Sequence, residues 1–274
     1  MLRTHFTLVA SLASTLAAST ALGQASTPTA STPTDLKVTI TNEGNADFTL
    51  TPLWFAFQNG GFDSFDAGSL ASPAIEAIAE DGIVDGLIMD FDASGQPGNR
   101  QGVVTAPGGF PGAPVIENGE TGTAFITPIN PAAYQYFSFA SMVIPTNDNF
   151  IGNDDPLAYQ VFDAAGNIND PSGTFTITVL ASDIWDAGTE LNNGLGAPFS
   201  TAGGTATDTT DPIALEANNL ADFVGITTPS GVTITNLYDP SDVVATITIS
   251  QIPEPATLSL LALAPLGMVT RRRR

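Results

Sequence analysis

The sequence predicts an all-β protein, an antiparallel β-sandwich with one short helix and long loops. Short segments that alternate apolar and polar residues, or that are rich in β-branched and aromatic residues, recur along the chain. Segments rich in Gly, Asn, Asp and Pro separate them, which is typical of sandwiches whose strands are joined by turns. Hydrophobic residues make up 43% of the 274 residues, so the chain can bury a core.

The expected strands begin at Leu36. Residues 36–41 alternate apolar and polar side chains, and residues 48–57 are β-branched and aromatic. Further strands are expected at 124–127, 136–144, 158–162, 174–179, 231–235 and 243–249. Residues 91–122 and 192–212 are rich in glycine and weakly patterned, so we expect loops there.

One helix is expected, over residues 74–81. Ser72 can cap its N-terminus, Pro73 suits the first turn, and Gly82 can end it. Ile75 and Ile78 would share the buried face. No second helix is expected.

The charge balance restricts the partners. The chain has 28 acidic residues and seven Lys and Arg, a formal net charge of −21. Arg3 and Arg271 to Arg274 account for five of the seven, which leaves Lys37 and Arg100 in the body. Nucleic acid and anionic lipid require clustered Lys and Arg, so neither is expected as a partner, whereas cations are.

Histidine and cysteine are nearly absent. The single histidine is His5, and there is no cysteine. Ser-His-Asp and Cys-His catalysis, and zinc sites built on those ligands, are therefore excluded from the body of the chain. Stability outside the cell must come from the core or from bound metal, because no disulfide can form.

The N-terminus has the features of a secretory signal peptide. Residues 1–24 combine a charged start, an apolar run from Phe6 to Leu22 and small residues before Ser26, which predicts export through the Sec machinery. Residues 25–35 are rich in Ser, Thr and Pro, which predicts a flexible leader.

The C-terminus, residues 252–274, has three parts. The motif Pro253, Glu254 and Pro255 precedes an apolar stretch, Thr257–Thr270, and four arginines that would stay at the cytoplasmic face. This tail resembles the PEP-CTERM sorting signal of Gram-negative bacteria. The resemblance implies transient anchoring in the inner membrane, then recognition by an exosortase, a membrane transpeptidase that cuts near the motif. The protein would then reach the cell surface or the extracellular matrix.

Three acidic loops have the composition of calcium sites, because calcium takes oxygen ligands from carboxylates, amides and carbonyls. They span Asp90–Gly95, Asn147–Asp155 and Asp186–Glu190. The first begins like an EF-hand loop, with Asp90, Asp92 and Ser94 at alternate positions, but its twelfth position is Gln101 where a Glu is needed. A solvated turn is the alternative reading of that loop.

The other two loops carry a second resemblance. Residues 137–152 are similar to a strand ending in Ser-Met-Ile-x-Pro-Ser-x-Asp-x-Phe-x-Gly, and residues 185–190 to a later Asp-Ala-Gly-Thr-Asp motif. Both belong to the spondin N-terminal domain, whose bacterial members also resemble residues 71–82. The resemblance covers most of residues 36–200. It implies a sandwich similar to a C2 domain over residues 36–250, with calcium in loops at one end.

The resemblance also implies the metal ligands. Asp148 matches the acid of the first motif, and Asp186 and Glu190 match the acids of the second, with Glu190 one methylene longer than the family's Asp. Both motifs follow expected strands, so neighbouring strands would bring the three carboxylates together, and a divalent cation would remove their repulsion. Alternatively, Asp148 makes an Asx-turn and Asp186 caps a turn.

Aromatic residues could serve the core or a ligand. The alternating set is better explained as sandwich core than as a sugar-binding face; it comprises Trp54, Phe55, Phe57, Tyr134, Tyr136, Phe137 and Phe139. Phe62 and Phe65, flanked by Gly and Asp, are the residues expected to make exposed contacts.

These observations predict a non-enzymatic surface or matrix protein that acts in adhesion and is stiffened by calcium, with exopolysaccharide or other surface ligands as partners. A polysaccharide hydrolase built on two carboxylates is one alternative. A structural biofilm component without a discrete ligand is the other.

Overall fold

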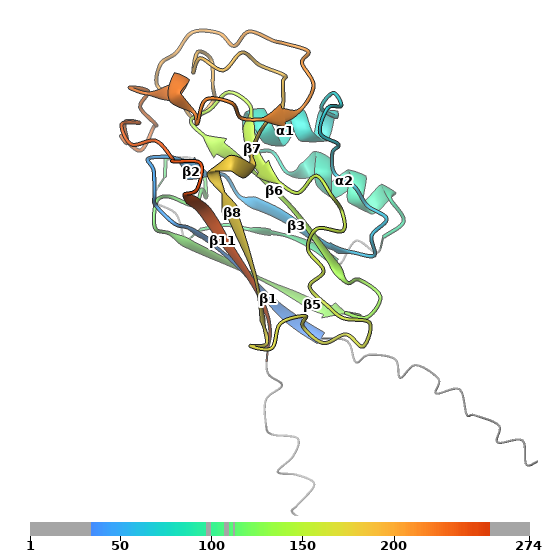
Figure 1. Ribbon diagram of the computed structural model, residues 1–274. Coiled ribbons are helices and arrows are strands. Elements are labelled where there is room, and N and C mark those ends of the chain that lie inside the picture. The colour runs from blue at the N-terminus through green and yellow to red at the C-terminus, as the bar shows by residue number, and fades with distance from the viewer. Residues whose placement is uncertain (1–33, 97–99, 107–109, 112, 253–274) are drawn as a thin grey trace, which may run out of the picture. The chain divides into compact units, whose positions relative to one another are not determined.

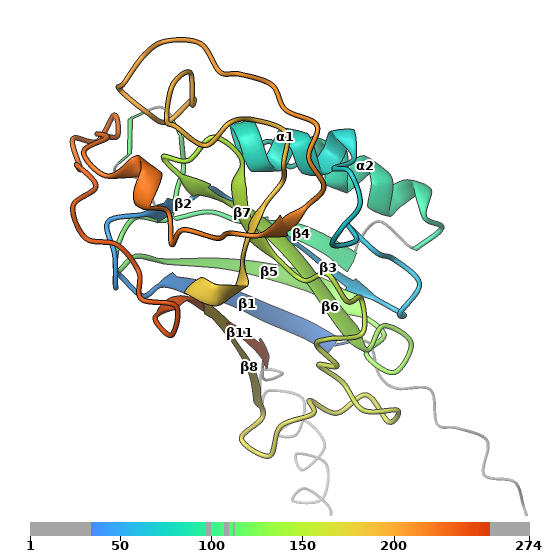
Figure 2. The same ribbon diagram turned by 45° about the horizontal axis from the view of Figure 1, so that its top comes forward.

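The computed structural model describes residues 34–96, 100–106, 110–111 and 113–252, all within the larger of two compact units, Ser31–Arg274. Two antiparallel sheets are stacked, and two helices cover the outer face of one of them (Figures 1 and 2). The predicted all-β sandwich is confirmed. The signal peptide and the sorting motif lie outside the described residues.

The smaller sheet has four strands, in the order β5-β1-β11-β8. Their bounds are β1 Thr34–Asn42, β5 Thr121–Ile129, β8 Thr174–Leu180 and β11 Val243–Gln251. Val38 lies opposite Ala124 on one side and Ile249 on the other. The last strand is therefore central to the sheet, and residues 243–251 belong to the sandwich.

The larger sheet has seven strands, in the order β10-β9-β7-β6-β3-β4, with β2 paired to β6. Their bounds are β2 Thr49–Leu50, β3 Leu53–Gln58, β4 Gln101–Val104, β6 Tyr136–Ile144, β7 Asn149–Gly152, β9 Ile184–Asp186 and β10 Ala214–Leu215. The strand expected over 48–57 is two strands, and Pro52 lies at the break, where it has no N–H for the ladder.

The core lies between the sheets. It contains Phe55 and Phe57 of β3, stacked and edge-on against Phe137 of β6 with ring centroids 5.7 and 5.1 Å apart. Val38 and Ile247 face them from the smaller sheet. The interpretation as sandwich core is confirmed for Phe55, Phe57, Phe137 and Phe139, which are buried between the sheets. Trp54 is buried in the second cluster, with residues of the two helices, and Tyr134 and Tyr136 are only half-buried.

The expected helix is present as α1, Pro73–Asp81. The Ser72 hydroxyl accepts a hydrogen bond from the Ile75 amide at 3.3 Å, and Gly82 ends the helix in the left-handed region at φ 67°. Ile75 and Ile78 are buried against the larger sheet.

The expectation of a single helix is wrong. A second helix, α2, spans Asp85–Ala93 and buries Leu87 and Phe91, one turn apart. Its N-cap, Val84, offers no side-chain cap, so the usual start signal is missing. Gly86 lets α1 approach closely, since a Cβ there would lie 2.8 Å from the Ala74 Cα.

Two expected strands are not strands. Residues 158–162 and 231–235 take part only in isolated bridges, among them Phe162 with Ile168 and Thr227 with Thr233. Gln160 also forms a single bridge to Tyr136 at the start of β6, but the pairing does not continue into a ladder.

Phe62 and Phe65 were expected to be exposed, and this expectation is wrong, because they are only 5% and 7% exposed. Phe62 packs on Trp54 and Phe91, and Phe65 packs edge-on against Trp185 with ring centroids 5.3 Å apart. Both rings fill the space between the larger sheet and the segments that cover it. Their Gly and Asp neighbours form the turns that bring them inward.

No helix among the described residues is long and apolar enough to cross a membrane.

Tyr238 offers a test of core packing. Its ring stacks on Phe48, with centroids 5.6 Å apart, and its buried hydroxyl has no hydrogen-bond partner among the described residues. Because an unsatisfied buried hydroxyl is destabilising, Tyr238→Phe should leave the free energy of unfolding unchanged or raise it by about 1 kcal/mol. Phe48→Ala should lower it by about 3–5 kcal/mol, because it opens a cavity. Urea unfolding measures both, and a large loss in Tyr238→Phe would contradict the packing described.

Candidate metal centre

Asp148 lies in the turn between β6 and β7 and is completely buried. The turn is held by Thr146, whose hydroxyl donates to the Val143 carbonyl and accepts from the Asn149 amide at 3.1 Å. Pro145 follows the last residue of β6 and has no N–H to extend the ladder. The sequence thus ends one strand, turns, and begins the next with Asp148 at the inside of the bend.

A second loop wraps around Asp148. Its Oδ2 accepts hydrogen bonds from the Thr189 amide at 2.8 Å and the Glu190 amide at 3.0 Å, and the Thr189 hydroxyl lies at 3.3 Å. Its backbone carbonyl accepts from the Ala187 amide at 3.1 Å. The other carboxylate oxygen, Oδ1, is buried and has no partner within the described part of the chain. Half of this carboxylate is therefore satisfied and half is not.

Asp186 reaches the same place from β9. It lies opposite Asn149 in the β7–β9 ladder. Its Oδ1 accepts from the Gly188 amide at 2.7 Å, and its Oδ2 accepts from the Asn192 side chain at 2.8 Å. The strand that precedes the second motif, β8, belongs to the other sheet. Asp186 is therefore brought beside Asp148 by β9, a three-residue strand that was not expected, and not by β8.

Two amide side chains add oxygen atoms beside these acids. The Oδ1 atoms of Asn149 and Asn192 are buried and lack hydrogen-bond partners among the described residues. The Asn149 amide nitrogen donates to Glu216 Oε2 at 2.9 Å. Glu216 follows β10, so this part of the site comes from a distant segment of the chain.

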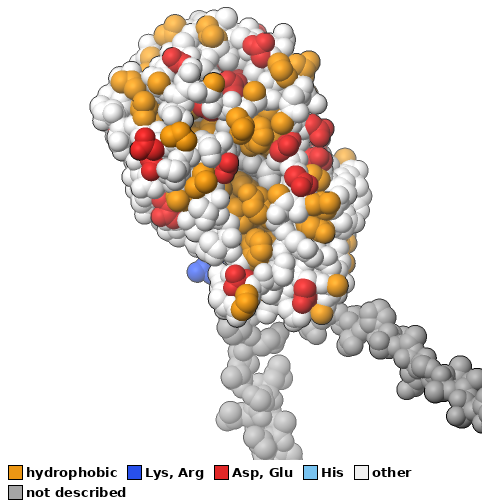
Figure 3. Space-filling view, viewed as in Figure 1, with side chains coloured by type: hydrophobic (Ala, Val, Ile, Leu, Met, Phe, Trp, Pro, Cys, Tyr) orange, Lys and Arg blue, Asp and Glu red, His pale blue; other side chains and the backbone are white. Residues whose placement is uncertain are grey.

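The site is electrostatically unfavourable when it is fully ionised. Burial, together with the neighbouring Asp186 carboxylate, raises the pKa of Asp148 to about 7. Burial also raises the pKa of Asp186, with Glu216 and Asp211 adding to the effect. Acidic side chains are spread over the face seen in Figure 3, where basic ones are nearly absent. A divalent cation would relieve this repulsion.

Glu190 is oriented differently. Its Oε2 accepts from the Asn147 side chain at 3.0 Å, and the acids that raise its pKa, after burial, are Asp208, Asp81 and Glu76. The structure thus brings Asp148 and Asp186 together and turns the Glu190 carboxylate toward a second acidic group. Within the described ranges, no three or more His, Cys, Asp or Glu side chains form a group that could hold a metal ion. Any metal bound by Asp148 and Asp186 would need amide oxygens as well.

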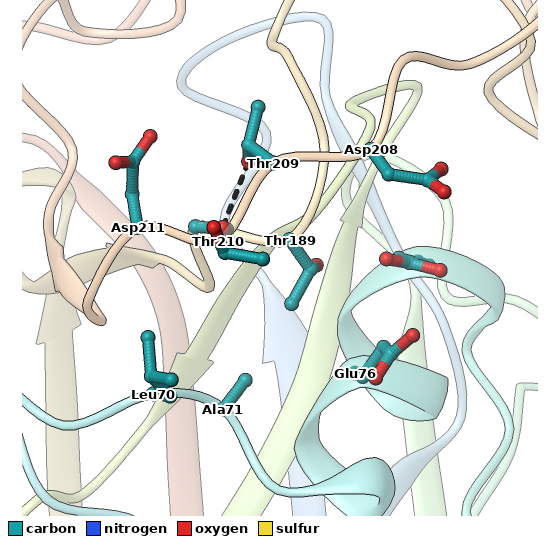
Figure 4. A pocket seen from close by; sticks show the side chains of 10 residues that line it. Leu70, Ala71, Glu76, Thr189, Asp208, Thr209, Thr210 and Asp211 are labelled. Atoms are coloured by element: carbon teal, nitrogen blue, oxygen red, sulfur yellow. Dashed lines mark hydrogen bonds between the residues drawn. The ribbon is translucent and has the colours of Figure 1, made fainter.

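Two acids of this second group, Glu76 and Asp208, line a pocket of about 340 Å³ between α1 and the loop 208–211. Figure 4 shows Glu76 on the helix and Asp208 on the facing loop at one side, with Asp211 at the other. Glu80 also lines the pocket, and burial raises its pKa. All its polar side chains are carboxylates or threonine hydroxyls, so it suits a cationic or uncharged occupant.

The segment that begins like an EF-hand loop is not a loop. Asp90 and Asp92 lie in α2, and Asp92 Oδ1 accepts from the Gln101 side chain at 2.9 Å. Helical residues two apart do not face each other, so the alternate acids cannot converge on one ion. Both interpretations made from the sequence, a metal-binding loop and a solvated turn, are therefore wrong for this segment.

Comparison with known proteins adds no relative. No protein-family model matches the chain, and no curated protein matches it significantly. The resemblances to the spondin N-terminal domain and to the PEP-CTERM signal stay predictions.

The sequence analysis did not single out three residues that border these acids. Asn149 stands within the acidic loop, but nothing distinguished it from its neighbours. Asn192 opens a glycine-rich segment, and Glu216 has no motif around it. Their places follow from strand pairing and loop contacts.

The buried Asp148 predicts a pH dependence of stability. Its pKa is about 7 when folded and near 3.8 when unfolded, so the folded state holds the proton more tightly. Its contribution to stability is therefore present at low pH and is lost as pH rises from about 4 through 7. In the presence of chelator, this group should make the free energy of unfolding, measured with urea, about 2 kcal/mol lower at pH 8 than at pH 5.

Asp148→Asn isolates this effect, because the amide cannot ionise while every other carboxylate is unchanged. The decrease in the free energy of unfolding between pH 5 and pH 8 should be smaller in the variant than in the wild type by about 2 kcal/mol. Equal drops in the two proteins would show that Asp148 ionises normally.

Proposed function

We propose that this chain is an exported, non-enzymatic protein of the cell surface or extracellular matrix, whose β-sandwich binds calcium in the loops after β6 and β9. The observation that carries the proposal is the buried Asp148 Oδ1, which lacks a partner beside a second acid, Asp186. A buried carboxylate oxygen without a donor is costly unless a cation or proton satisfies it. The resemblance to the spondin N-terminal domain points to the same two residues.

The residues present fit calcium. Asp148 and Asp186 would supply carboxylate oxygens, and Asn149 and Asn192 would supply the amide oxygens that now lack donors. Glu216 accepts a hydrogen bond from the Asn149 side-chain nitrogen and would hold that amide in place. Calcium accepts such mixed oxygen sets and tolerates irregular geometry, whereas zinc prefers the His and Cys that this region lacks. Glu190, assigned to the ligand set by resemblance, would contribute its amide to Asp148 and hold the loop.

Calcium bound in these loops would make the surface that they form more rigid. The loop after Asp186 is bonded to a distant strand-like segment, with Asp211 N donating to the Gly188 carbonyl at 2.9 Å and Thr209 N to the Thr189 carbonyl at 2.7 Å. Leu191, Leu195 and Leu215, in and beside these loops, are 44–51% exposed. Fixing the loops would lower the entropy cost of contact with a partner, which suits an adhesive role.

The ends of the chain support the location. A signal peptide over residues 1–24 would send the chain through the Sec machinery. The motif at Pro253, Glu254 and Pro255 would present it to an exosortase while the tail holds it in the inner membrane. Release or transfer would leave the sandwich at the cell surface or in the matrix.

A polysaccharide hydrolase is the second candidate, and the acidic pocket is the observation that favours it. Glu80 has a raised pKa, as a general acid requires, and Glu76 and Asp208 lie in the same pocket. Release of reducing sugar from polysaccharides that stops in Glu80→Gln would establish this function. Equal release by the variant would exclude Glu80 as the acid.

The calcium site predicts a metal-dependent melting temperature. Calcium at 100 times its dissociation constant should stabilise the purified chain by about 2.7 kcal/mol relative to chelator, because it binds only the folded state. Asp186→Asn should lose most of this gain. Differential scanning calorimetry in calcium and in chelator measures it.

Asp90→Asn is the matched control, because it removes one negative charge from an exposed position on α2. Its calcium response should equal that of the wild type. If wild type, Asp186→Asn and Asp90→Asn all melt at the same temperature with and without calcium, the metal site is disproved.

A further inference from the structure

The outer face of the smaller sheet carries a regular array of threonines. Each of its four strands contains two threonines separated by one buried or glycine residue. They are Thr39 and Thr41 in β1, Thr121 and Thr123 in β5, Thr176 and Thr178 in β8, and Thr246 and Thr248 in β11. The side chains between them point into the core, so the eight threonines share the outer face.

The strand register aligns these threonines into two rows. One row runs Thr121, Thr41, Thr246, Thr178, and the other runs Thr123, Thr39, Thr248, Thr176. Those on the edge strands are exposed, and those on the inner strands are half-buried by their neighbours. Adjacent strands lie about 4.8 Å apart and alternate residues about 6.7 Å apart, so the hydroxyls form a two-by-four lattice.

Half of these eight hydroxyls have no hydrogen bond within the described residues. Thr41 and Thr121 share a hydrogen bond of 2.9 Å, and Thr39 lies 3.4 Å from Thr123. In the part of the chain that the structure describes, no hydrogen bond involves the hydroxyls of the threonines on β8 and β11. Each can donate and accept. Threonine side chains are stiff at χ1, so ordering them on binding costs little entropy.

The two threonine rows contain no charged residue, in a chain with a net charge of −21. The next row along the strands is Phe125, Lys37, Ser250 and Thr174. Asp35 lies past this row, at the end of β1, and no carboxylate stands within the lattice. Phe125 is 66% exposed and offers an apolar surface beside the hydroxyls. An uncharged ligand with many hydroxyls and apolar ring faces matches this chemistry.

We propose that this threonine face binds a chain of neutral polysaccharide. Sugar hydroxyls would pair with the threonine rows, and the Phe125 ring would stack on a sugar face. Strands in a sheet rotate by about 20–25° from one to the next, so a flexible polymer can follow the face better than a flat crystal can. The inference names a ligand class for the adhesive role proposed above, but it does not require calcium, whose site lies on the other sheet.

Threonine pairs also stabilise sheets, so the test must separate binding from folding. Thr→Val removes the hydroxyl and keeps the β-branched shape. The row variant combines Thr39→Val, Thr123→Val, Thr176→Val and Thr248→Val. Thr227→Val with Thr233→Val is the control, because these two hydroxyls form an exposed cross-strand pair of 2.8 Å outside the sheet.

The measurement is affinity electrophoresis of the full chain, kept in mild detergent, through native gels. The gels contain hydroxyethyl cellulose, a β-1,3-glucan, a galactomannan or alginate, the last of which is carboxylated. We expect at least one neutral polymer to retard wild type and control equally, with an affinity at least tenfold weaker in the row variant. Phe125→Ala changes a single exposed side chain and should also weaken retardation. It provides the test of binding if the row variant fails to fold.

Several results would overturn the proposal. These are no retardation by any neutral polymer, retardation by alginate alone, or equal retardation of the wild type, the row variant and Phe125→Ala. Inhibition of ice recrystallisation that the row variant loses, without polysaccharide binding, would instead assign the array to ice. Since the calcium response is a separate melting experiment, either proposal can fail while the other stands.

Discussion

The buried carboxylate of Asp148 is the interaction on which the arrangement of the loops depends. It accepts backbone hydrogen bonds from residues 189 and 190, while its own carbonyl fixes residue 187. Those contacts bend the chain after β9, and the bend sets the path of residues 208–211, which bond to the same loop. One side chain without access to water thus organises three segments that are far apart in sequence.

The two sheets divide the chemistry of the surface between them. Asp148, Asp186 and Glu216 lie at one end of the larger sheet, where the Asp186 carboxylate raises the pKa of Asp148 and the Glu216 carboxylate raises the pKa of Asp186. The smaller sheet turns an uncharged threonine face outward. The proposed calcium site and the proposed polysaccharide-binding face would therefore lie on different sheets.

Much of the fold could be predicted because its main strands carry a clear period. The alternation at Val38 and Ile40, and at Ile247 and Ile249, follows directly from one buried and one exposed face. Prediction failed where tertiary contact outweighs local pattern. Helix α2 lacks a capping side chain and is held by Phe91 in an aromatic cluster, and short strands such as β9 contain too few residues to show a period.

The sequence by itself determined the acidic character, the absence of His and Cys from the body, the principal strands, and Asp148 and Asp186 as candidate ligands. These follow from composition and from motifs a few residues long. Only the tertiary structure decided that Asn149, Asn192 and Glu216 join those acids, that Glu190 turns away, and that eight threonines align. The reason is that strand register and loop contacts join residues tens or hundreds of positions apart, and no local pattern encodes which of them will meet.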